Sequence, residues 1–373
     1  MSLFLTEGWY DPSKRDATGH LCSNLELLVL GVLFRLGNGS CSRWAIQTGT
    51  NIDKEVHRRF FQLFTSKIAG IQGRYISLPK DEVSLRYVTR DYAALGLPGC
   101  CGSIDVVHIG WDACPANLLH LFKGKESYPS IAYEVIVNQR REIMSVTNGH
   151  PGARNDKHIC RLDDQLLSLS NGDGWLSEKE WWAFGEDDKT LVEKGLYLIC
   201  DGGYLRWPTL ICPIKVSERF LQLSKVIEGA RKDVEDVFGM LKKRFLYLKH
   251  WNTTRTQSVI DNAFVTCCVL HNMQLRSDGY LDDNLVASSF SSMRPFRSQN
   301  RGDSIWRRDW EEYRLPGHVS RRTCGATNEK KWRERMKVLL VHFLQHMALK
   351  KTEDERAAAR RAAIIEAARP RPS

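Results

Sequence analysis

Two aspartates lie inside or at the end of short apolar segments, where a strand can present an acid to a metal ion. Asp105 lies within Gly102–Ile109, and Asp201 follows Leu196–Cys200 and precedes two glycines. A carboxylate in a buried strand is costly unless it is paired or binds a cation. The glycines after Asp201 permit a sharp turn and a close approach by a ligand. Two such acids in one sheet can share a divalent cation.

A third acid is expected from the helix predicted over Glu218–Leu248. At about 100° per residue Asp236 points to solvent, while Glu235 and Asp233 fall on opposite flanks of the buried stripe. Periodicity alone leaves both of these acids open. Gly239 lies on the flank of Glu235, and its missing side chain leaves room for a substrate, which favours Glu235. The stripe itself consists of Ile227, Ala230, Val234, Val237, Phe238 and Leu241.

The elements that must position these acids begin after Pro98 and Gly99, where the sequence becomes typical of an α/β domain. Alternation and apolar runs predict strands over 102–109, 128–138, 142–147 and 196–200, and helices over 155–168, 218–248 and 258–275. The long helix is expected to break or bend near Gly229 and Gly239. This order matches an RNase H-like fold, and no early GxGxxG motif of a dinucleotide fold occurs.

A helical region, residues 22–98, precedes this domain and follows a lead-in, residues 1–21, that is expected to be flexible. Lys54, Arg58 and Arg59 project from its third helix, as in a helix-turn-helix that contacts DNA. A small helical subdomain with a solvated basic face is the alternative. The three helices are expected over 25–36, 43–47 and 53–69, with Thr48-Gly49-Thr50-Asn51 as a turn.

The C-terminal end carries most of the excess positive charge. Residues 301–373 contain 18 Lys and Arg against 10 Asp and Glu, out of a net charge of +10 for all 373 residues. Such an end can bind nucleic acid or act as a nuclear import signal. A polar linker is expected over 276–327, and basic helices over 328–349 and 353–368 within a C-terminal region, residues 328–373.

Cysteine usage and the apolar runs bear on the compartment. The chain has 11 cysteines and no CxxC pair, which is typical of buried thiols in a reducing compartment. The first residues lack the basic segment of a signal peptide. The longest apolar runs are too short to cross a bilayer, so no membrane association is expected.

Three further features admit two interpretations each. His271 is expected to bond the neighbouring asparagine or the backbone rather than act in catalysis. Trp181 and Trp182 lie in a polar insertion, where packing and stacking on DNA bases are both open. His342 and His346 lie one helical turn apart in an amphipathic segment, so a core-facing or partner-facing pair is expected rather than a metal pair.

Five motifs follow one another over residues 99–275. In order and spacing they resemble the DDE domain of PIF/Harbinger transposases, most closely the plant-type members, and the N-terminal helices fit that family's helix-turn-helix region. The motifs are Gly102-Ser103-Ile104-Asp105-x-x-His108, Pro151-Gly152-Ala153-Arg154-Asn155-Asp156, Cys200-Asp201-Gly202-Gly203-Tyr204, Arg231-Lys232-Asp233-Val234-Glu235-x-x-Phe238-Gly239 and Cys267-Cys268-Val269-Leu270-His271-Asn272-Met273.

The resemblance implies that Asp105, Asp201 and Glu235 form a DDE triad, with Asp156 as a further metal ligand. Two Mg²⁺ or Mn²⁺ ions about 3.5–4 Å apart would then support phosphoryl transfer, in which water nicks DNA and a DNA 3′-hydroxyl later joins strands.

The resemblance also bears on the residues around the reacting phosphate. His108, Arg231 and Lys242 could contact the phosphate or orient an acid, although a structural role is the simpler interpretation of His108.

The resemblance further implies partners and a location. The partners are double-stranded DNA with terminal inverted repeats, a separate Myb/SANT-type DNA-binding protein and a second copy of this chain. The expected location is the nucleus, with the cytoplasm as a second site. A domesticated derivative that binds DNA or chromatin without catalysis is the alternative function. An RNase H-type RNA nuclease would share the fold and the metals.

Overall fold

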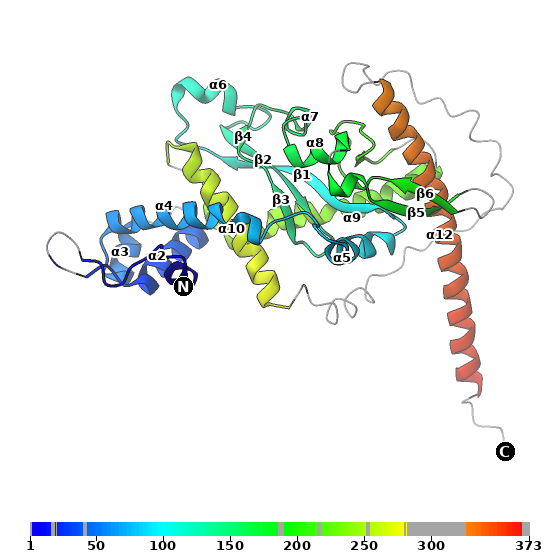
Figure 1. Cartoon of the computed structure of the whole chain (residues 1–373), viewed down its shortest axis with the longest axis horizontal. Coiled ribbons are helices and arrows are strands. Elements are labelled where there is room, and N and C mark those ends of the chain that lie inside the picture. The colour runs from blue at the N-terminus through cyan, green and yellow to red at the C-terminus, as the bar shows by residue number, and fades with distance from the viewer. Residues whose placement is uncertain are drawn as a thin grey trace. The chain divides into compact units, whose positions relative to one another are not determined.

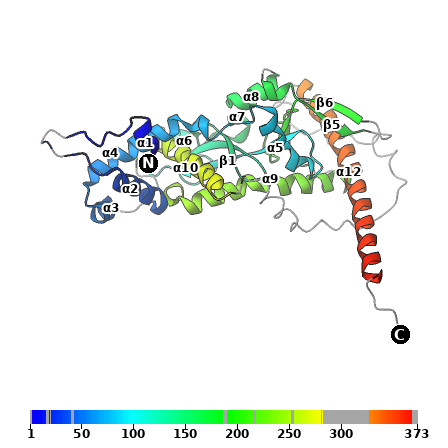
Figure 2. The same cartoon turned by 60° about the horizontal axis from the view of Figure 1, so that its bottom comes forward.

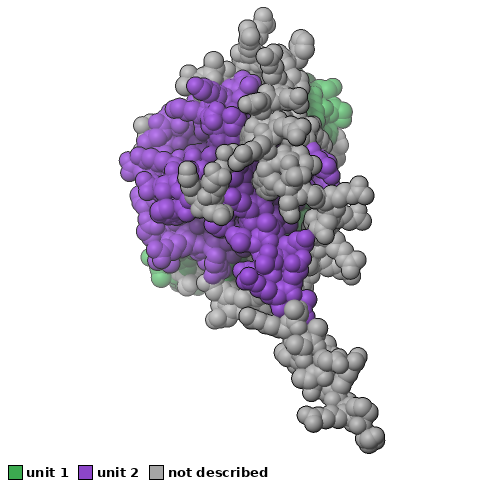
Figure 3. Space-filling model, turned by 90° about the vertical axis from the view of Figure 1, so that its right-hand side faces the viewer, with its two compact units in different colours: residues 1–78, 104–163, 232–311 green, residues 79–103, 164–231, 312–373 purple. Residues whose placement is uncertain are grey.

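The computed structural model describes residues 2–15, 19, 21–39, 43–172, 174–185, 190–214, 218–250, 254–279, 281 and 326–367 (Figure 1). These residues form an α/β protein with two compact units (Figure 3). Unit 1 comprises residues 1–78, 104–163 and 232–311, and unit 2 comprises residues 79–103, 164–231 and 312–373.

Two elements belong to both units, namely strand β1 (Cys100–Gly110) and helix α9 (Glu218–Arg244). Figure 2 shows α9 as one continuous helix, so the break predicted near Gly229 and Gly239 is absent. No helix among the described residues has the length and apolar character needed to span a membrane. The predicted linker, residues 276–327, lies mostly outside the described residues.

Unit 1 begins with helices that bury an aromatic cluster. Phe4 is 2% exposed and stacks on Phe64, with ring centroids 5.1 Å apart. The first residues of the chain therefore pack as a helix, where the sequence predicted a flexible lead-in. These helices are α1 (Ser2–Thr6), α2 (Leu25–Asn38), α3 (Arg43–Thr50) and α4 (Lys54–Gly70).

Side-chain caps explain where α2 and α4 begin. Asn24 Oδ1 accepts hydrogen bonds from the first turn of α2, and Asp53 Oδ1 accepts one from the N–H of Glu55 in α4. Asn51, with a φ of 54°, makes the turn between α3 and α4, whereas Gly49 lies inside α3. The predicted helix pair is present, with asparagine rather than glycine in the left-handed conformation.

The sheet of unit 1 packs one face against helices. Strand β2 (Ser130–Val137) lies beside β1 and pairs antiparallel with β3 (Ile143–Val146) and β4 (His150–Pro151). Alternate β2 side chains, as predicted, join a core with helix α10 (Gln257–Ser277), where Tyr133 stacks on Phe264 at 4.0 Å.

The segment predicted as one helix over residues 155–168 forms two short helices. These are α7 (Asp156–Ile159) in unit 1 and α8 (Asp164–Asn171) in unit 2. Asp163, a residue type that favours helix starts, directly precedes α8. A further short helix of unit 1, α6 (Leu119–Phe122), follows a 3-10 turn.

Unit 2 contains parallel strands and a separate hairpin. Strand β7 (Tyr197–Ile199) pairs parallel with Cys100–Ser103 of β1 and with β8 (Leu210–Ile211). The sequence did not predict helix α5 (Glu82–Ala93) or the hairpin of β5 (Glu180–Phe184) and β6 (Thr190–Lys194).

The two adjacent tryptophans lie on β5 and face opposite ways. Trp181 is 6% exposed and its indole N–H donates to the carbonyl of Gly195, whereas Trp182 is 64% exposed. Packing is thus confirmed for Trp181, and stacking on DNA bases stays a prediction for Trp182.

The C-terminal helix of unit 2 is continuous over α12 (Ala326–Ala367), where two helices were predicted. The indole N–H of Trp332 donates to the carbonyl of Leu210 at 2.9 Å. His342 accepts from the N–H of Phe184 at 3.0 Å, which confirms a core-facing histidine. The buried side chains of this helix include Trp332, Met336, Leu339, Leu340 and Phe343. This half of α12 is therefore part of the core of unit 2.

Candidate active site

Asp105 lies on the face of β1 that packs against α9. Val107 and Ile109 of β1 belong to the core that contains Val234 of α9. Because side chains alternate along a strand, Asp105 points to the same face as Val107. It is half-buried, and its Oδ1 accepts from the N–H of Val106 at 2.9 Å.

Two hydrogen bonds determine how β1 lies along α9. In unit 2, Ser103 Oγ donates to the carbonyl of Ala230 at 3.3 Å. In unit 1, Lys242 Nζ donates to the carbonyl of His108 at 3.2 Å. The two elements therefore run in the same direction. Between the two bonds the strand advances about 16 Å and the helix about 18 Å. The two elements therefore cover nearly the same length between these contacts.

This register places Glu235 level with Asp105 in unit 1. Asp105 lies about 10 Å before His108 along the strand, and Glu235 lies about 10.5 Å before Lys242 along the helix. Seven residues make almost two helical turns, so Glu235 and Lys242 share a flank of α9. Glu235 is exposed, and a ligand can reach it.

Asp233 lies on the opposite flank of α9, beside Arg141 of the β2–β3 turn. Arg141 Nη2 is 2.9 Å from Asp236 Oδ2, and its Nε is 3.9 Å from Asp233 Oδ1. Burial raises the pKa of Asp233 to about 7, although Arg141 acts to lower it. The side chain of Asp236 is 54% exposed, as predicted. The structure thus separates Glu235 from both neighbouring aspartates.

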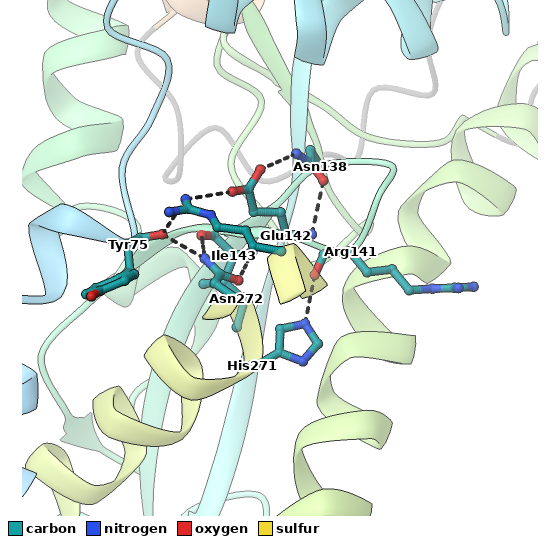
Figure 4. A network of polar contacts seen from close by, with 8 residues as sticks. Tyr75, Asn138, Arg141, Glu142, Ile143, His271 and Asn272 are labelled. Carbon is teal, nitrogen blue, oxygen red and sulfur yellow. Dashed lines mark hydrogen bonds and ion pairs between the residues drawn. The ribbon is translucent and has the colours of Figure 1, made fainter. Parts of the chain in front are cut away.

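His271 and Asn272 of α10 hold the turn that carries Arg141 (Figure 4). His271 Nε2 donates to the carbonyl of Arg141 at 2.9 Å. Asn272 accepts from the N–H of Ile143 and donates to the carbonyls of Ile143 and Tyr75, much as a neighbouring strand would. Both motif side chains are fully buried. The predicted structural role of His271 is confirmed.

Asp201 lies two residues after the end of β7 in unit 2, whereas the sequence predicted a strand that runs up to Cys200. Its Oδ1 accepts from the N–H of Gly203 at 2.7 Å. A Cβ added to Gly202 would meet nothing within 4 Å, so the space beside this turn is open. The preceding Cys200 hydrogen-bonds to Cys212 at the end of β8, and this bond lowers the pKa of Cys212.

Asp156 lies near His108, in a polar cluster of unit 1. Burial lowers the pKa of His108, and the charges of Glu126 and Asp156 oppose that shift. His108 Nδ1 is 3.0 Å from Ser130 Oγ. Alternation puts His108 on the face of β1 opposite Asp105. A shared ion between Asp156 and Asp105 stays a prediction.

The two cations predicted to contact phosphate lie on the same flank of α9 as Glu235. Burial lowers the pKa of Lys242, with Glu126 opposing, and its ammonium already bonds the carbonyl of His108. Arg231 lies one turn before Glu235, belongs to unit 2 and is half-buried. Phosphate contact stays a prediction for Arg231, whereas the ammonium of Lys242 is already bonded to β1.

The basic residues predicted to contact DNA lie on α4. Arg58 bonds Glu55 through two nitrogens at 2.7 and 2.6 Å, and Arg59 reaches the same carboxylate at 3.3 Å. These bonds, that of Arg58 above all, lower the pKa of Glu55 to about 2. Arg59 is nevertheless 76% exposed. Lys54 begins the helix.

The acids have the donor chemistry that suits a hard divalent cation. Carboxylate oxygens are the ligands that Mg²⁺ and Mn²⁺ prefer. Within the part of the chain that the structure describes, no three or more His, Cys, Asp or Glu side chains are grouped to hold a metal ion. Asp105 and Glu235 belong to unit 1, and Asp201 belongs to unit 2.

Sequence reasoning missed two residues that position this site. Ser103 was visible as a hydroxyl inside an apolar strand, which needs a hydrogen-bond partner when it is buried. Arg141 has a φ of 63°, and no sequence signal marks it because glycine or asparagine usually fills such positions.

Comparison with known proteins assigns the family. The model of the plant transposon protein family matches residues 74–282. The chain is 25% identical over 195 residues to "Protein ALP1-like" of Arabidopsis thaliana, which covers 50% of this chain and 46% of that protein. It is 22% identical to "Putative nuclease HARBI1" of Rattus norvegicus and 21% identical to that of Homo sapiens, each over 57% of this chain and 56% of the relative.

The chain spans about half the length of the curated relatives it matches. No solved structure matches it. The family match covers more than half of the chain and includes Asp105, Asp156, Asp201 and Glu235. The predicted PIF/Harbinger resemblance is confirmed, and the chain belongs to the plant transposon protein family.

Proposed function

We propose that this protein is a metal-dependent DNA transposase or nuclease that cleaves and joins strands at element ends. The register of β1 and α9, which sets Glu235 level with Asp105, is the observation that supports the proposal most strongly. Asp201 supports it further, since this acid lies just beyond the end of a strand that pairs with β1. The relatives whose names include the word nuclease agree with this reaction class.

The catalytic core is proposed to be RNase H-like. The strand pairings support this fold, because β2 pairs antiparallel with β3 and lies next to β1, while β7 pairs parallel with both β1 and β8. The order of elements along the chain, with α9 following the strands, agrees with the same fold.

In the proposed site Asp105, Asp201 and Glu235 would hold two Mg²⁺ or Mn²⁺ ions, with Asp156 as an additional ligand. Bound ions would supply positive charge to the attacking and leaving oxygens of the scissile phosphate. Gly239 leaves room for a DNA strand beside α9, because a Cβ added to this glycine would meet nothing within 4 Å.

The proposed partners are those expected of such an enzyme. Duplex DNA with terminal inverted repeats would contact Lys54, Arg58 and Arg59 on α4, and Arg231 on α9. A Myb/SANT-type protein and a second copy of the chain complete the set, and the proposed location is the nucleus. Arg59 is the most exposed of the α4 arginines and is expected to contribute most to binding.

Divalent-dependent nicking of a duplex that carries the element's own ends tests the proposal. Asp105→Asn, Asp201→Asn and Glu235→Gln should each keep the fold and abolish nicking, because each swap removes ligand charge with little change in shape. A misplaced reacting group can cost about 10²-fold. Wild-type protein that binds the ends yet never nicks them in Mg²⁺ or Mn²⁺ would support the domesticated, non-catalytic alternative.

A further inference from the structure

We infer that Ser103 and Lys242 are positioning residues that hold Glu235 level with Asp105, and that Lys242 does this instead of binding DNA phosphate. The inference rests on the proposed function, which supplies the role of the two acids. It concerns the two hydrogen bonds that join β1 to α9 before and after this pair of acids.

Ser103 lies inside a chain of hydrogen bonds in unit 2. It is 0% exposed, as is Tyr92 of α5. The two hydroxyl oxygens are 3.1 Å apart, and Ser103 Oγ also donates to the carbonyl of Ala230. Tyr92 therefore donates to Ser103, because the single proton of Ser103 is already used. Strand, helix α5 and helix α9 are joined at this one buried hydroxyl.

Lys242 lies at the other end of the aligned segment, in unit 1. Its ammonium donates to a backbone carbonyl of β1 and lies near the carboxylate of Glu126. Lys242 is half-buried, and a charge partly withdrawn from water is costly without such partners. Moving its ammonium to a DNA phosphate would break both contacts. Lys243, the next residue along α9, is exposed and offers a matched cation without these contacts.

The position of Glu235 depends strongly on this register. A slip of α9 by one residue would move each side chain about 1.5 Å along the axis and turn it about 100° around it. Such a turn would carry Glu235 off the flank that it shares with Lys242. A misplacement of about 1 Å caused by a substitution away from the reacting atoms can lower activity by about 10²-fold.

Full-length Ser103→Ala, Lys242→Met and Lys242→Arg test the inference, with Lys243→Met as the control. We expect Ser103→Ala and Lys242→Met to weaken Mn²⁺ binding and to lower kcat by up to about 10²-fold. The DNA Kd and its salt dependence should stay unchanged, and Lys242→Arg should restore much of the loss. A salt slope reduced by about one in Lys242→Met would instead identify a phosphate contact and overturn the inference.

A metal-free measurement separates this inference from the proposed function. A short thiol cross-linker should join the double variant Asp105→Cys/Glu235→Cys, and should join Asp105→Cys/Asp233→Cys far less. Adding Lys242→Met should lower the yield for the first pair. Equal yields for the two pairs would refute the register even in a protein that neither binds Mn²⁺ nor cuts DNA. A selective cross-link in a protein that does not bind Mn²⁺ would support the register of β1 and α9 and would refute the proposed metal-dependent function.

Discussion

Asn272 offers the sharpest test of how the fold supports the site. Its side chain is 0% exposed and makes three hydrogen bonds, one with the N–H of Ile143 at 2.9 Å and two with the carbonyls of Ile143 and Tyr75 at 2.7 and 2.9 Å. At about 1 kcal/mol for each bond, Asn272→Ala should lower the free energy of unfolding of unit 1 by about 3 kcal/mol. Met273→Ala, at a neighbouring position that is 39% exposed, should change it by less than about 0.5 kcal/mol.

The substitution Asn272→Asp should make the free energy of unfolding depend on pH. The new carboxylate keeps the acceptor for the N–H of Ile143 but places its second oxygen against two carbonyls. Burial and these carbonyls should raise its folded-state pKa above the unfolded value of about 4. The variant should therefore be most stable at low pH and lose stability as pH rises from 5 to 8, by up to about 1.4 kcal/mol per pH unit.

Native-state hydrogen exchange of the α10 amides measures both effects in the full chain. Asn272→Ala should show the same loss at every pH, whereas the loss in Asn272→Asp should grow with pH. If Asn272→Ala lowered the free energy of unfolding no more than Met273→Ala does, the stabilising role of the Asn272 hydrogen bonds shown in Figure 4 would be refuted. If the stability of Asn272→Asp did not depend on pH, the assignment of Asn272 Nδ2 as the donor to the carbonyls of Ile143 and Tyr75 would be refuted.

Three further predictions concern α9 and α12. Gly239→Ala and Gly229→Ala should each stabilise the helix by about 0.5–1 kcal/mol, since neither new Cβ meets an atom within 4 Å, but only Gly239→Ala should slow DNA cleavage; equal rates would contradict the assigned space. Trp332→Ala should destabilise unit 2 by about 3–5 kcal/mol in urea unfolding, whereas Leu349→Ala, at a position 54% exposed, should be neutral; a neutral Trp332→Ala would remove α12 from the core. Because the folded-state pKa of Asp233 is raised to about 7 from an unfolded value of about 4, wild-type stability should fall relative to Asp233→Asn as pH rises from about 4 to about 7, and the opposite slope would contradict that shift.

Local sequence patterns predicted strands β1, β2, β3 and β7 and helices α2, α3, α4, α9 and α10, because each of these elements depends on near neighbours in the chain. The alternation in β2 and the capping residue Asp53 are signals of this kind. The buried face of α4 does not follow from residue type alone, because the apolar Val56 is 40% exposed while the polar His57 is 6% exposed. His57 fits there because Gly31 of α2 leaves room, since a Cβ on that glycine would lie 2.5 Å from His57 Nδ1. The sequence of α4 alone cannot predict this burial, because the space for His57 is created by a glycine in another helix.

The burial of α12 could not be predicted from its own sequence. Its buried face contacts β5, and Arg335 bonds the carbonyl of Pro208, all remote in sequence. The excess positive charge of residues 301–373 invites their deletion as a test of DNA binding. Such a deletion would remove Trp332 and its buried neighbours, so a test of the basic end must begin after Leu349.

The choice of Glu235 over Asp233 shows what the structure adds at the site. Helical periodicity placed the two acids on opposite flanks and could not choose between them. The contact of Arg141 with Asp233 and the contact of Lys242 with β1 distinguish these flanks. Both depend on residues more than 90 positions away in the chain, which a local pattern cannot register.

Divalent-dependent nicking by Glu235→Gln and Asp233→Asn, measured side by side with wild type, tests the central claim most directly. The substrate is a duplex that carries the element's ends, in Mg²⁺ or Mn²⁺, with the Myb/SANT-type partner supplied. We predict that Glu235→Gln cuts nothing while Asp233→Asn cuts like wild type. An inactive Asp233→Asn together with an active Glu235→Gln would contradict the assignment of the third acid and the register on which it depends.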